Sequence, residues 1–311
     1  MAIIALEEHY IDAEVQAALG APSTPLDEKL ADFASARLQD MDRAGITMQV
    51  LSHAPPGLQR IDSGNAVALA VRANDRLRQI VANAPTRFAG FASLPTSDPA
   101  SAADELERAV TKLHFKGAMI HGMIDAVDFM DDRKYWPIFE RAQALDVPIY
   151  IHPAEPHPDV IRRYFGTYAK THPMFVRAAW GFTFETGTHA MRLVLSGVFD
   201  VYPRLKIILG HFGEAIPFLM ARIDEALSRD TPMKNFRDVF SSHFYVTTSG
   251  FFSDPALLCC LQEMGTDRIL FSVDWPYASN TAGTQWLGGV PLPKEDREKI
   301  AFKNAQRLLR I

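Results

Sequence analysis

The sequence predicts an α/β fold, a (β/α)8 TIM barrel built as a single domain over residues 1–311 with loop insertions. Short β-branched or apolar runs alternate with longer amphipathic stretches along the whole chain. The expected strands are apolar on both faces, which is typical of a parallel sheet with helices outside it. Eight such units in 311 residues fit a closed barrel. A doubly wound open sheet is the alternative, but no Gly-rich phosphate loop follows any strand.

Each expected strand is a run of four to six mostly apolar residues. The runs are short enough for strands, and the stretches between them are long enough for the helices that parallel crossovers need. In chain order the strands are expected at residues 3–6, 48–52, 88–93, 117–120, 149–152, 206–209, 244–247 and 269–272.

The expected helices have recognisable boundaries. Asp98-Pro99 and Ser253-Asp254-Pro255 are helix-start signals, and Gly45 and Gly265 are helix-stop signals. The helices are expected at residues 27–44, 65–84, 100–113, 133–145, 184–199, 214–227, 255–264 and 294–310. Two stretches, 153–183 and 228–242, are too long for simple connections, so we expect them to cap a site or to contact another subunit.

Composition excludes several classes of protein. The chain carries 32 basic and 37 acidic side chains, a formal balance of −5, so bulk charge favours neither nucleic acid nor an anionic membrane. The only cysteines, Cys259 and Cys260, are adjacent, which excludes a Cys-based zinc site and suits a reducing compartment. Residues 1–10 do not read as a signal peptide, and no run approaches the ~20 apolar residues of a membrane span. We expect a cytoplasmic protein.

Acidic and imidazole side chains gather at the ends of the expected strands. Glu7 and His9 follow the first strand, His152 ends the fifth, and Asp274 follows the eighth. In a barrel, the C-terminal ends of the strands line the active site, so these residues should share one rim. Residues two apart on a strand point the same way, so Glu7 and His9 should project together while Glu8 faces the other side.

Oxygen and nitrogen ligands of this kind suit a single divalent ion such as Zn²⁺ or Mn²⁺. Each residue taken alone could be an ordinary polar strand end. The coincidence at several strand ends favours a metal site built from Glu7, His9, His152 and Asp274.

The chain resembles the amidohydrolase-related, metal-dependent decarboxylases, a family that includes γ-resorcylate and hydroxybenzoate decarboxylases. The resemblance covers nearly the whole length. It rests on these motifs: Glu7-Glu8-His9, Arg72-Ala73-Asn74-Asp75, Leu94-Pro95, His152-Pro153, Pro203-Arg204-Leu205, Gly210-His211-Phe212-Gly213-Glu214, Thr247-Thr248-Ser249-Gly250, Asp274-Trp275-Pro276 and Asn304-Ala305-Gln306-Arg307-Leu308.

The resemblance implies roles for individual residues. It assigns the metal to Glu7, His9, His152 and Asp274, and it makes Asp274 the donor of a proton to the substrate ring. It places His211 beside the substrate, oriented by Glu214, although Glu214 is also explained as an acidic residue at a helix start. Lys116, at the wrong end of its strand to bridge a second ion, agrees with one metal rather than two.

The resemblance also suggests how a substrate is held. Trp180 and Tyr277 belong to a group of aromatic residues near the expected rim, although core packing explains each one singly. Arg222 matches a helix arginine that in the family reaches a neighbouring subunit's site, which implies a homodimer or homotetramer. The alternative for Arg222 is an ion pair with Asp224 or Glu225. His121 stands where γ-resorcylate decarboxylase has Asn, and we expect it to contact the substrate.

The implied activity is non-oxidative loss of CO₂ from a small hydroxylated aromatic carboxylic acid, carried out by a carbon–carbon lyase. A divalent ion that chelates the phenolate and the carboxylate would hold the ring in place. A metal-dependent hydrolase of a lactone or related ester is the alternative on the same scaffold. A third possibility is a barrel that binds a metal or an aromatic acid without turnover.

Overall fold

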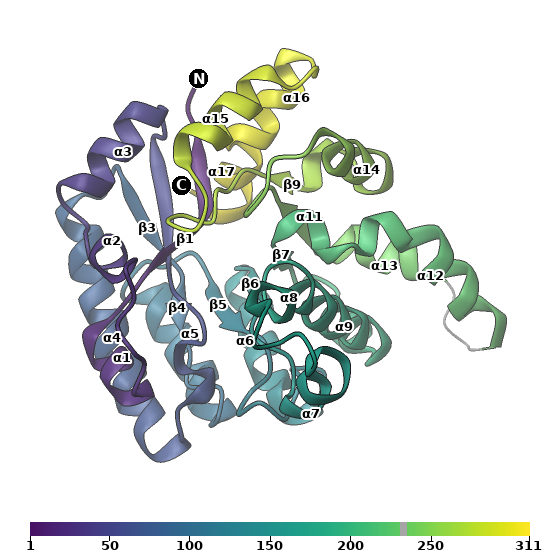
Figure 1. Cartoon of the computed structure of the whole chain (residues 1–311), viewed down its shortest axis with the longest axis horizontal. Helices are drawn as coiled ribbons and strands as arrows, with labels where there is room; N and C mark the ends of the chain where they lie inside the picture. Colours follow the sequence, from purple (N-terminus) through teal and green to yellow (C-terminus); the bar gives the residue numbers. More distant parts are fainter. Residues whose placement is uncertain (231–234) are drawn as a thin grey trace.

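In residues 1–230 and 235–311, which the computed structural model describes, nine short strands pair in parallel and form the inner wall of the molecule (Figure 1). They hydrogen-bond as one group of three, β1-β2-β3, and one group of six, β4 to β9. Their bounds are β1 (Ile4–Tyr10), β2 (Met48–His53), β3 (Phe88–Gly90), β4 (Ala92–Ser93), β5 (Ala118–His121), β6 (Ile149–His152), β7 (Ile207–Leu209), β8 (Phe244–Thr247) and β9 (Ile269–Leu270).

The two groups are continuous at Phe91, which lies between β3 and β4. Phe91 donates its N–H to Leu51 O at 2.9 Å on one side. The next residue, Ala92, donates to Gly117 O at 2.9 Å on the other side. The single strand expected at 88–93 is therefore present but divided at Phe91, and β3 and β4 are two halves of one barrel strand.

The barrel closes between its first and last strands. Glu8 in β1 forms a parallel bridge with Trp275, five residues beyond the end of β9, and His9 N donates to Trp275 O at 2.8 Å. The first strand therefore continues to Tyr10 rather than ending at residue 6, because its last residues pair with the segment that follows β9. The prediction of a closed eight-stranded α/β barrel is confirmed.

Helices surround the strands on the outside (Figure 1). Short 3₁₀ turns are η1 (Gly57–Arg60), η2 (Arg133–Tyr135) and η4 (Thr266–Arg268), and π-helical turns are η3 (Ile161–Phe165) and η5 (Lys299–Lys303). The α-helices are α1 (Ala13–Leu19), α2 (Asp27–Leu30), α3 (Ala36–Ala44), α4 (Ser63–Asn83), α5 (Pro99–Thr111), α6 (Trp136–Leu145), α7 (Pro158–Val160), α8 (Pro173–Val176), α9 (Gly181–Leu195), α10 (Val198–Val201), α11 (His211–Glu214), α12 (Ile216–Asp230), α13 (Phe236–His243), α14 (Asp254–Met264), α15 (Asn280–Gly289), α16 (Lys294–Glu298) and α17 (Asn304–Leu309).

Capping residues explain where several helices begin and end. The Asp98 side chain accepts from Ser101 N at 3.2 Å at the start of α5, and Ser253 caps α14 through Ala256 N. Gly45 ends α3 in the left-handed conformation, with φ of 71°. These signals were the ones expected from the sequence.

Three helix predictions need correction. The helix expected at 27–44 is two helices, because Asp32 accepts backbone N–H groups of residues 34–37 and starts α3 afresh. The helix expected at 184–199 begins at Gly181 and ends at Leu195, followed by α10. The helix expected at 294–310 is divided into α16, η5 and α17. The sequence pattern also missed α1 and α15.

The long stretches expected to be insertions contain short helices. Residues 153–183 hold α7, η3 and α8. The stretch 228–242 is largely helical, since α12 runs to Asp230 and α13 begins at Phe236, and its residues 231–234 lie outside the described residues. In Figure 1, α12 extends outward from the barrel.

Inward side chains fill the barrel below the rim and leave the carboxyl ends of the strands to polar residues. The last helix, α17, packs against the end of the barrel opposite the rim. The buried cluster contains Ile4, Leu6, Val50, Ala89, Phe91, Met119, Tyr150, Ile208, Tyr245, Leu270, Ala305, Leu308 and Leu309.

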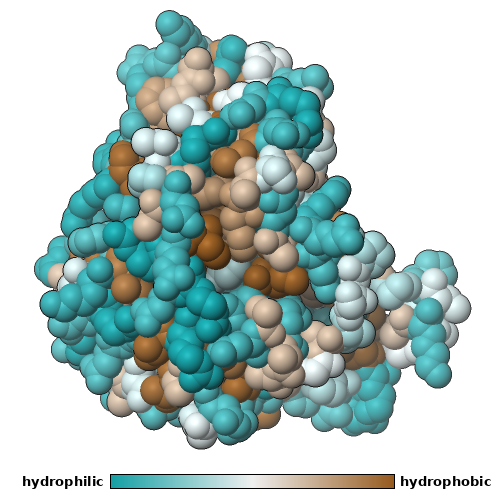
Figure 2. Space-filling model, turned by 90° about the vertical axis from the view of Figure 1, so that its left-hand side faces the viewer, coloured by the Kyte–Doolittle hydropathy of each residue, from teal (hydrophilic) through white to brown (hydrophobic). Residues whose placement is uncertain are grey.

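The outer surface near the first helices is mostly polar. Figure 2 shows this side of the molecule as largely hydrophilic, with smaller hydrophobic areas. Within residues 13–83, all of them described, no large hydrophobic side chain is strongly exposed, because the apolar faces of the helices pack on the barrel. Among the described residues, no helix is both long and apolar enough to cross a membrane.

Candidate metal centre

Strand β1 supplies two of the polar side chains at the rim. Glu7 and His9 are two residues apart, are both fully buried, and project to the same side of the strand. The register between β1 and β2 shifts between Ala5 and Glu8, where β1 contains one extra residue. Such a bulge bends a strand and redirects its side chains, and bulges are frequent beside functional sites.

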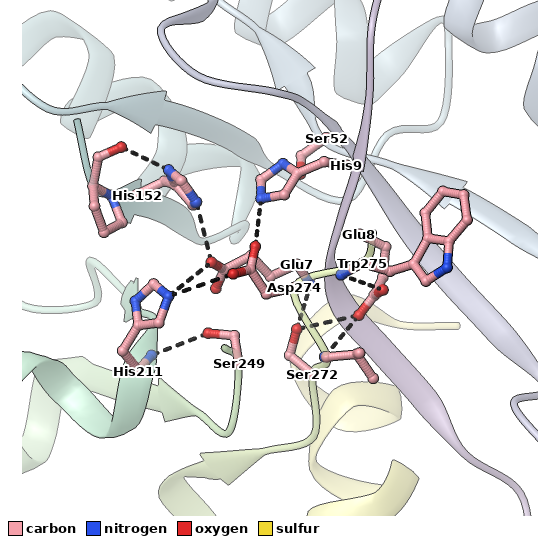
Figure 3. A network of polar contacts seen from close by, with 12 residues as sticks. Glu7, Glu8, His9, Ser52, His152, His211, Ser249, Ser272, Asp274 and Trp275 are labelled. Atoms are coloured by element: carbon pink, nitrogen blue, oxygen red, sulfur yellow. Dashed lines mark hydrogen bonds and ion pairs between the residues drawn. The ribbon is translucent and has the colours of Figure 1, made fainter. Parts of the chain in front are cut away.

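His152, the last residue of β6, and Asp274, in the segment after β9, complete the cluster (Figure 3). His152 Nε2 lies 3.1 Å from Glu7 Oε1, and His9 Nε2 lies 3.1 Å from Asp274 Oδ1. One donor atom from each of the four side chains lies within 4.8 Å of the other three. The strand ends therefore converge as the spacing predicted.

The donors of this cluster suit one divalent cation. Glu7 Oε1 and His9 Nε2 are both buried, and apart from the 3.1 Å contacts inside the cluster neither has a hydrogen-bond partner. Buried polar atoms without partners are uncommon, and two carboxylates facing imidazole nitrogens need a positive charge to offset their burial. Two oxygen and two nitrogen ligands match the preferences of Mn²⁺ or Zn²⁺.

Each imidazole that faces the centre is fixed from behind through its Nδ1 atom. His9 Nδ1 lies 3.4 Å from Ser52 Oγ, and His152 Nδ1 lies 2.8 Å from Pro153 O. These contacts leave the Nε2 atoms of both rings directed at the carboxylates. A partner on the far nitrogen sets the tautomer that a metal ligand needs.

Hydroxyl groups of β6 and β8 hold the Glu7 carboxylate in place. Tyr150 OH donates to Glu7 Oε2 and lies 2.9 Å from Thr247 Oγ1, which in turn lies 2.9 Å from Ser249 Oγ. Gly210 allows this carboxylate its position, because a Cβ at Gly210 would lie 2.8 Å from Glu7 Oε2. Tyr150 was not expected at the site, because its only signal in the sequence is a polar group within an apolar run.

The electrostatics around Glu7 favour its ionised form. Burial alone would raise the pKa of Glu7, but the imidazoles of His211, His152 and His9 outweigh burial and hold that pKa well below its ordinary value. Burial and the nearby Glu7 charge raise the pKa of the Tyr150 phenol well above its ordinary value, so Tyr150 keeps the proton that it donates.

His211 stands beside the cluster without joining the set of four. Its Nε2 lies 3.7 Å from Glu7 Oε1 and 3.9 Å from Asp274 Oδ2, and its Nδ1 lies 2.7 Å from Glu214 Oε1. Burial would lower the pKa of His211, but Glu214 and Glu7 raise it well above its ordinary value. A pair of this kind can hold a proton at Nε2, next to the space where a substrate would bind.

The backbone aims His211 at the centre through an unusual turn. Residues 211–215 all have positive φ, with His211 at 50° and Glu214 at 54°. Ser249 Oγ accepts from His211 N at 3.0 Å and so anchors this turn to the loop after β8. Backbone strain of this kind is found where a side chain must be held in a defined place.

Glu8 faces away from the cluster, as its position in the strand predicted. Its carboxylate accepts from Val273 N at 2.9 Å and Trp275 N at 3.3 Å, which joins β1 to the segment after β9. Burial raises the pKa of Glu8 to about 8. The fully buried Arg37 lies nearby, donates to His9 O, and places its guanidinium 4.0 Å from the Trp275 ring. Sequence reasoning missed Arg37, because nothing near it in the chain marks it as buried.

The four residues expected to bind substrate occupy different environments. The Tyr277 ring lies 5.7 Å from the His9 ring and is 50 % exposed; partial burial together with Asp274 raises the pKa of Tyr277 to about 12. His121 is buried beside His152. Trp180 is 53 % exposed at the start of α9, and its side chain has no hydrogen bond or ring contact with a described residue.

Arg222 is exposed on α12 and forms no ion pair with any residue in the described part of the chain. The alternative partners suggested by the sequence are occupied, because Glu225 pairs with Arg229 and Asp224 accepts from Arg237 N at 3.1 Å. Substrate binding by Arg222 and Trp180 stays a prediction.

Comparison with known proteins gives a consistent result. A family model described as amidohydrolase matches residues 9–311. The chain is 43 % identical to the γ-resorcylate decarboxylase of Polaromonas sp. (strain JS666), over 99 % of this chain and 98 % of that protein. It is 39 % identical to the γ-resorcylate decarboxylase of Rhizobium sp. (strain MTP-10005), with the same coverage.

Solved structures agree with the sequence comparison. The dihydroxybenzoic acid decarboxylase of Polaromonas sp. JS666, with bound manganese and the inhibitor 2-nitroresorcinol, superposes with a TM-score of 0.91 at 42 % identity, covering 99 % of this chain and 97 % of that one. The 5-carboxyvanillate decarboxylase of Sphingomonas paucimobilis superposes with a TM-score of 0.92 at 35 % identity and 99 % coverage of both chains.

Proposed function

Because this chain belongs to the amidohydrolase family, we propose that its carboxylate–imidazole centre removes CO₂ from a benzoate that carries a hydroxyl group next to the carboxylate. The chain is a metal-dependent decarboxylase of hydroxylated aromatic acids, and so a carboxy-lyase. The first candidate substrate is 2,6-dihydroxybenzoate, since relatives at 39 to 43 % identity are γ-resorcylate decarboxylases.

One observation carries the proposal. Glu7 Oε1 and His9 Nε2 are buried with no hydrogen-bond partner outside the cluster and converge with His152 and Asp274. We therefore assign the metal to Glu7, His9, His152 and Asp274. When bound, a divalent ion supplies the positive charge that draws the phenolate and carboxylate oxygens of the substrate into one fixed orientation.

Asp274 is the residue that we assign as proton donor to the ring. Its side chain is 14 % exposed, whereas those of Glu7 and His9 are fully buried, so it borders the space open to substrate. The ring carbon that bears the carboxylate accepts a proton from Asp274. The bond from that carbon to the carboxylate then breaks, its electron pair restores the aromatic ring, and CO₂ leaves. Asp274 regains its proton from the phenol of an incoming substrate.

His211 and Glu214 complete the proposed machinery. Glu214 orients His211 through the 2.7 Å contact at Nδ1, which directs Nε2 toward Asp274 and the substrate. A protonated Nε2 at this point would hold the anionic substrate close to Asp274. Tyr277, beside His9, adds a hydroxyl that can bond to a ring substituent.

A panel of acids and lactones tests this function. The purified protein, loaded with Mn²⁺ and in parallel with Zn²⁺, would be incubated with 2,6-dihydroxybenzoate, 2,3-dihydroxybenzoate, benzoate and simple aryl lactones. We expect CO₂ release and a change in ring absorbance only with ortho-hydroxylated acids. Lactone opening without CO₂ release from any acid would support the hydrolase instead.

We also propose a homodimer or homotetramer in a reducing, cytoplasmic compartment. Phe218 is 80 % exposed and Leu219 41 % exposed on the outward-extending α12, close to Arg222. Exposed apolar side chains in one place are typical of subunit contacts. Both cysteines are free, which suits a reducing compartment.

A further inference from the structure

His121 stands directly behind the metal-facing imidazole of His152. The two residues are in register on the neighbouring strands β5 and β6. Their Nδ1 atoms are 3.0 Å apart, and the two rings meet edge to face with centroids 4.8 Å apart. His121 is 2 % exposed and His152 4 % exposed, so bulk water does not compete for this contact.

The contact allows only one arrangement of protons when a metal is bound. His152 Nε2 faces Glu7 Oε1 at 3.1 Å and needs its lone pair free to act as a ligand. A neutral imidazole carries one proton, so the proton of His152 must be on Nδ1. His121 Nδ1 is then an acceptor, and the proton of His121 is on its Nε2. The reverse arrangement would put a proton on His152 Nε2 and block coordination.

The surrounding loop fixes the position of the His121 ring. A Cβ on Gly57 would lie 2.8 Å from His121 Cδ2, so glycine at this position leaves the space that the imidazole fills. Gln59 Oε1 accepts from His121 N at 3.2 Å, while Gln59 Nε2 donates to Leu94 O at 3.2 Å. Held in this way, the ring has little freedom to turn away from His152.

We propose that His121 is a positioning residue for the metal, which accepts the Nδ1 proton of His152 and so keeps the lone pair of His152 Nε2 directed at the ion. The proposal rests on the metal centre proposed above. It differs from the expectation that His121 contacts substrate, because Nδ1 of His121 is engaged by His152 and the Nε2 side of its ring lies against Gly57. Pro153 O, 2.8 Å from the same Nδ1 atom, shares this proton and adds to the effect.

Substitution by residues of similar shape separates the hydrogen bond from packing. Asn can place its Oδ1 near the position of Nδ1 and accept the same proton, whereas Leu has a similar size and no acceptor. We expect His121→Leu to weaken Mn²⁺ binding about tenfold, within the range for partners of metal ligands, and His121→Asn to stay within about threefold of wild type. Isothermal titration of chelator-treated protein with Mn²⁺ measures both.

A matched control removes another buried imidazole. His189 in α9 is fully buried and accepts from Met130 N through Nε2 at 3.1 Å, but it has no contact with the four ligands. His189→Gln should leave Mn²⁺ affinity unchanged. Thermal unfolding of the metal-free proteins identifies any variant that has not folded. The Co²⁺ absorption spectrum of the His121 variants adds a second readout, since a misoriented His152 changes the ligand field.

The outcomes separate this role from the enzyme's activity. Equal Mn²⁺ affinity in wild type and His121→Leu would overturn the proposal. If that variant also had a raised KM, the result would support the alternative, in which His121 contacts the substrate. If the His152→Ala variant bound Mn²⁺ as tightly as wild type, both the proposed metal centre and the role of His121 would be overturned. If His121→Leu lost Mn²⁺ affinity while His121→Asn kept it, and the wild-type protein released no CO₂ from any acid, the role of His121 would be supported and decarboxylation contradicted.

Discussion

His9 Nε2 lies 3.1 Å from Asp274 Oδ1, although His9 belongs to the first strand and Asp274 to the segment after the last. The contact exists because Glu8 and Trp275, their chain neighbours, pair across the closing edge of the barrel. The two ligands are thus brought together by the same backbone pairing that closes the fold. A substitution at Asp274 therefore tests the proposed site at the place where the barrel closes.

Asp274→Asn should reduce kcat by about a thousandfold, because the variant loses the proposed acid, a type of group that contributes about 10²- to 10⁴-fold. Loss of one charge should also weaken Mn²⁺ binding. Steady-state rates at saturating Mn²⁺ measure the first effect and titration measures the second. Asp267→Asn, at a surface carboxylate that pairs with Lys299, is the control and should behave as wild type. Full turnover by Asp274→Asn would refute its assignment as acid.

Glu214→Gln should lower kcat about a hundredfold while leaving the bound metal unchanged. The amide keeps the shape of Glu214 but no longer raises the pKa of His211, so less His211 carries a proton at Nε2. Metal analysis and the pH profile of kcat would be measured together. Glu225→Gln, at an exposed carboxylate on α12, serves as the matched control. An unchanged profile would leave Glu214 with only the role of an acidic residue before α12.

Arg222→Ala should raise KM about tenfold or more with kcat and metal content little changed. The side chain has no ion-pair partner in the described part of its own chain, so its charge is available to a substrate anion in a neighbouring subunit. Arg229→Ala, on the same helix, removes a side chain that pairs with Glu225 and should have little effect on KM. Identical kinetics in both variants would remove Arg222 from the site.

Stability should fall as pH rises because of Glu185. This residue of α9 is 3 % exposed, its Oε1 has no partner, and burial raises its pKa from 4.5 to about 8. Between these two values the folded protein holds a proton that the unfolded chain has released, so the free energy of unfolding decreases with rising pH. Between these two values Glu185 alone should contribute roughly 1.4 kcal/mol per pH unit to that decrease.

Glu185→Gln should remove the part of the slope that Glu185 contributes, while the part due to Glu8, whose pKa burial also raises to about 8, should remain. The variant should match wild type near pH 5, where Glu185 is neutral, and exceed it above pH 8. Thermal unfolding from pH 5 to 9 would measure the difference. Glu107→Gln, at an exposed carboxylate paired with Arg141, should keep the wild-type slope. Parallel curves for Glu185→Gln and wild type would contradict the assignment.

The four proposed ligands could be predicted because they depend on two simple regularities. The carboxyl ends of parallel strands meet at one edge, and side chains two apart share a face. Glu7 with His9 follows from the second regularity, and His152 with Asp274 from the first. The barrel itself followed from the alternation of apolar runs and amphipathic stretches.

The supporting contacts could not be predicted in the same way. Ser52, Tyr150 and Arg37 act on residues far away in the chain, and no local pattern marks them. The division of the helix expected at 27–44 depends on Asp32, whose carboxylate competes with helical hydrogen bonding only in the final geometry. Short-range signals predict the strands and their ends. The contacts that support the site residues depend instead on how distant segments of the chain pack.

The closure of the barrel at Glu8 and Trp275 gives the ion a role in the stability of the protein. Without a cation, the carboxylates of the buried Glu7 and the partly exposed Asp274 would lie close together at the junction of the first strand and the segment after the last, with no ion to offset their charges. Loss of the ion would therefore weaken the barrel at the pairing of Glu8 with Trp275. An ion bound there would then stabilise the folded chain as well as serve the reaction.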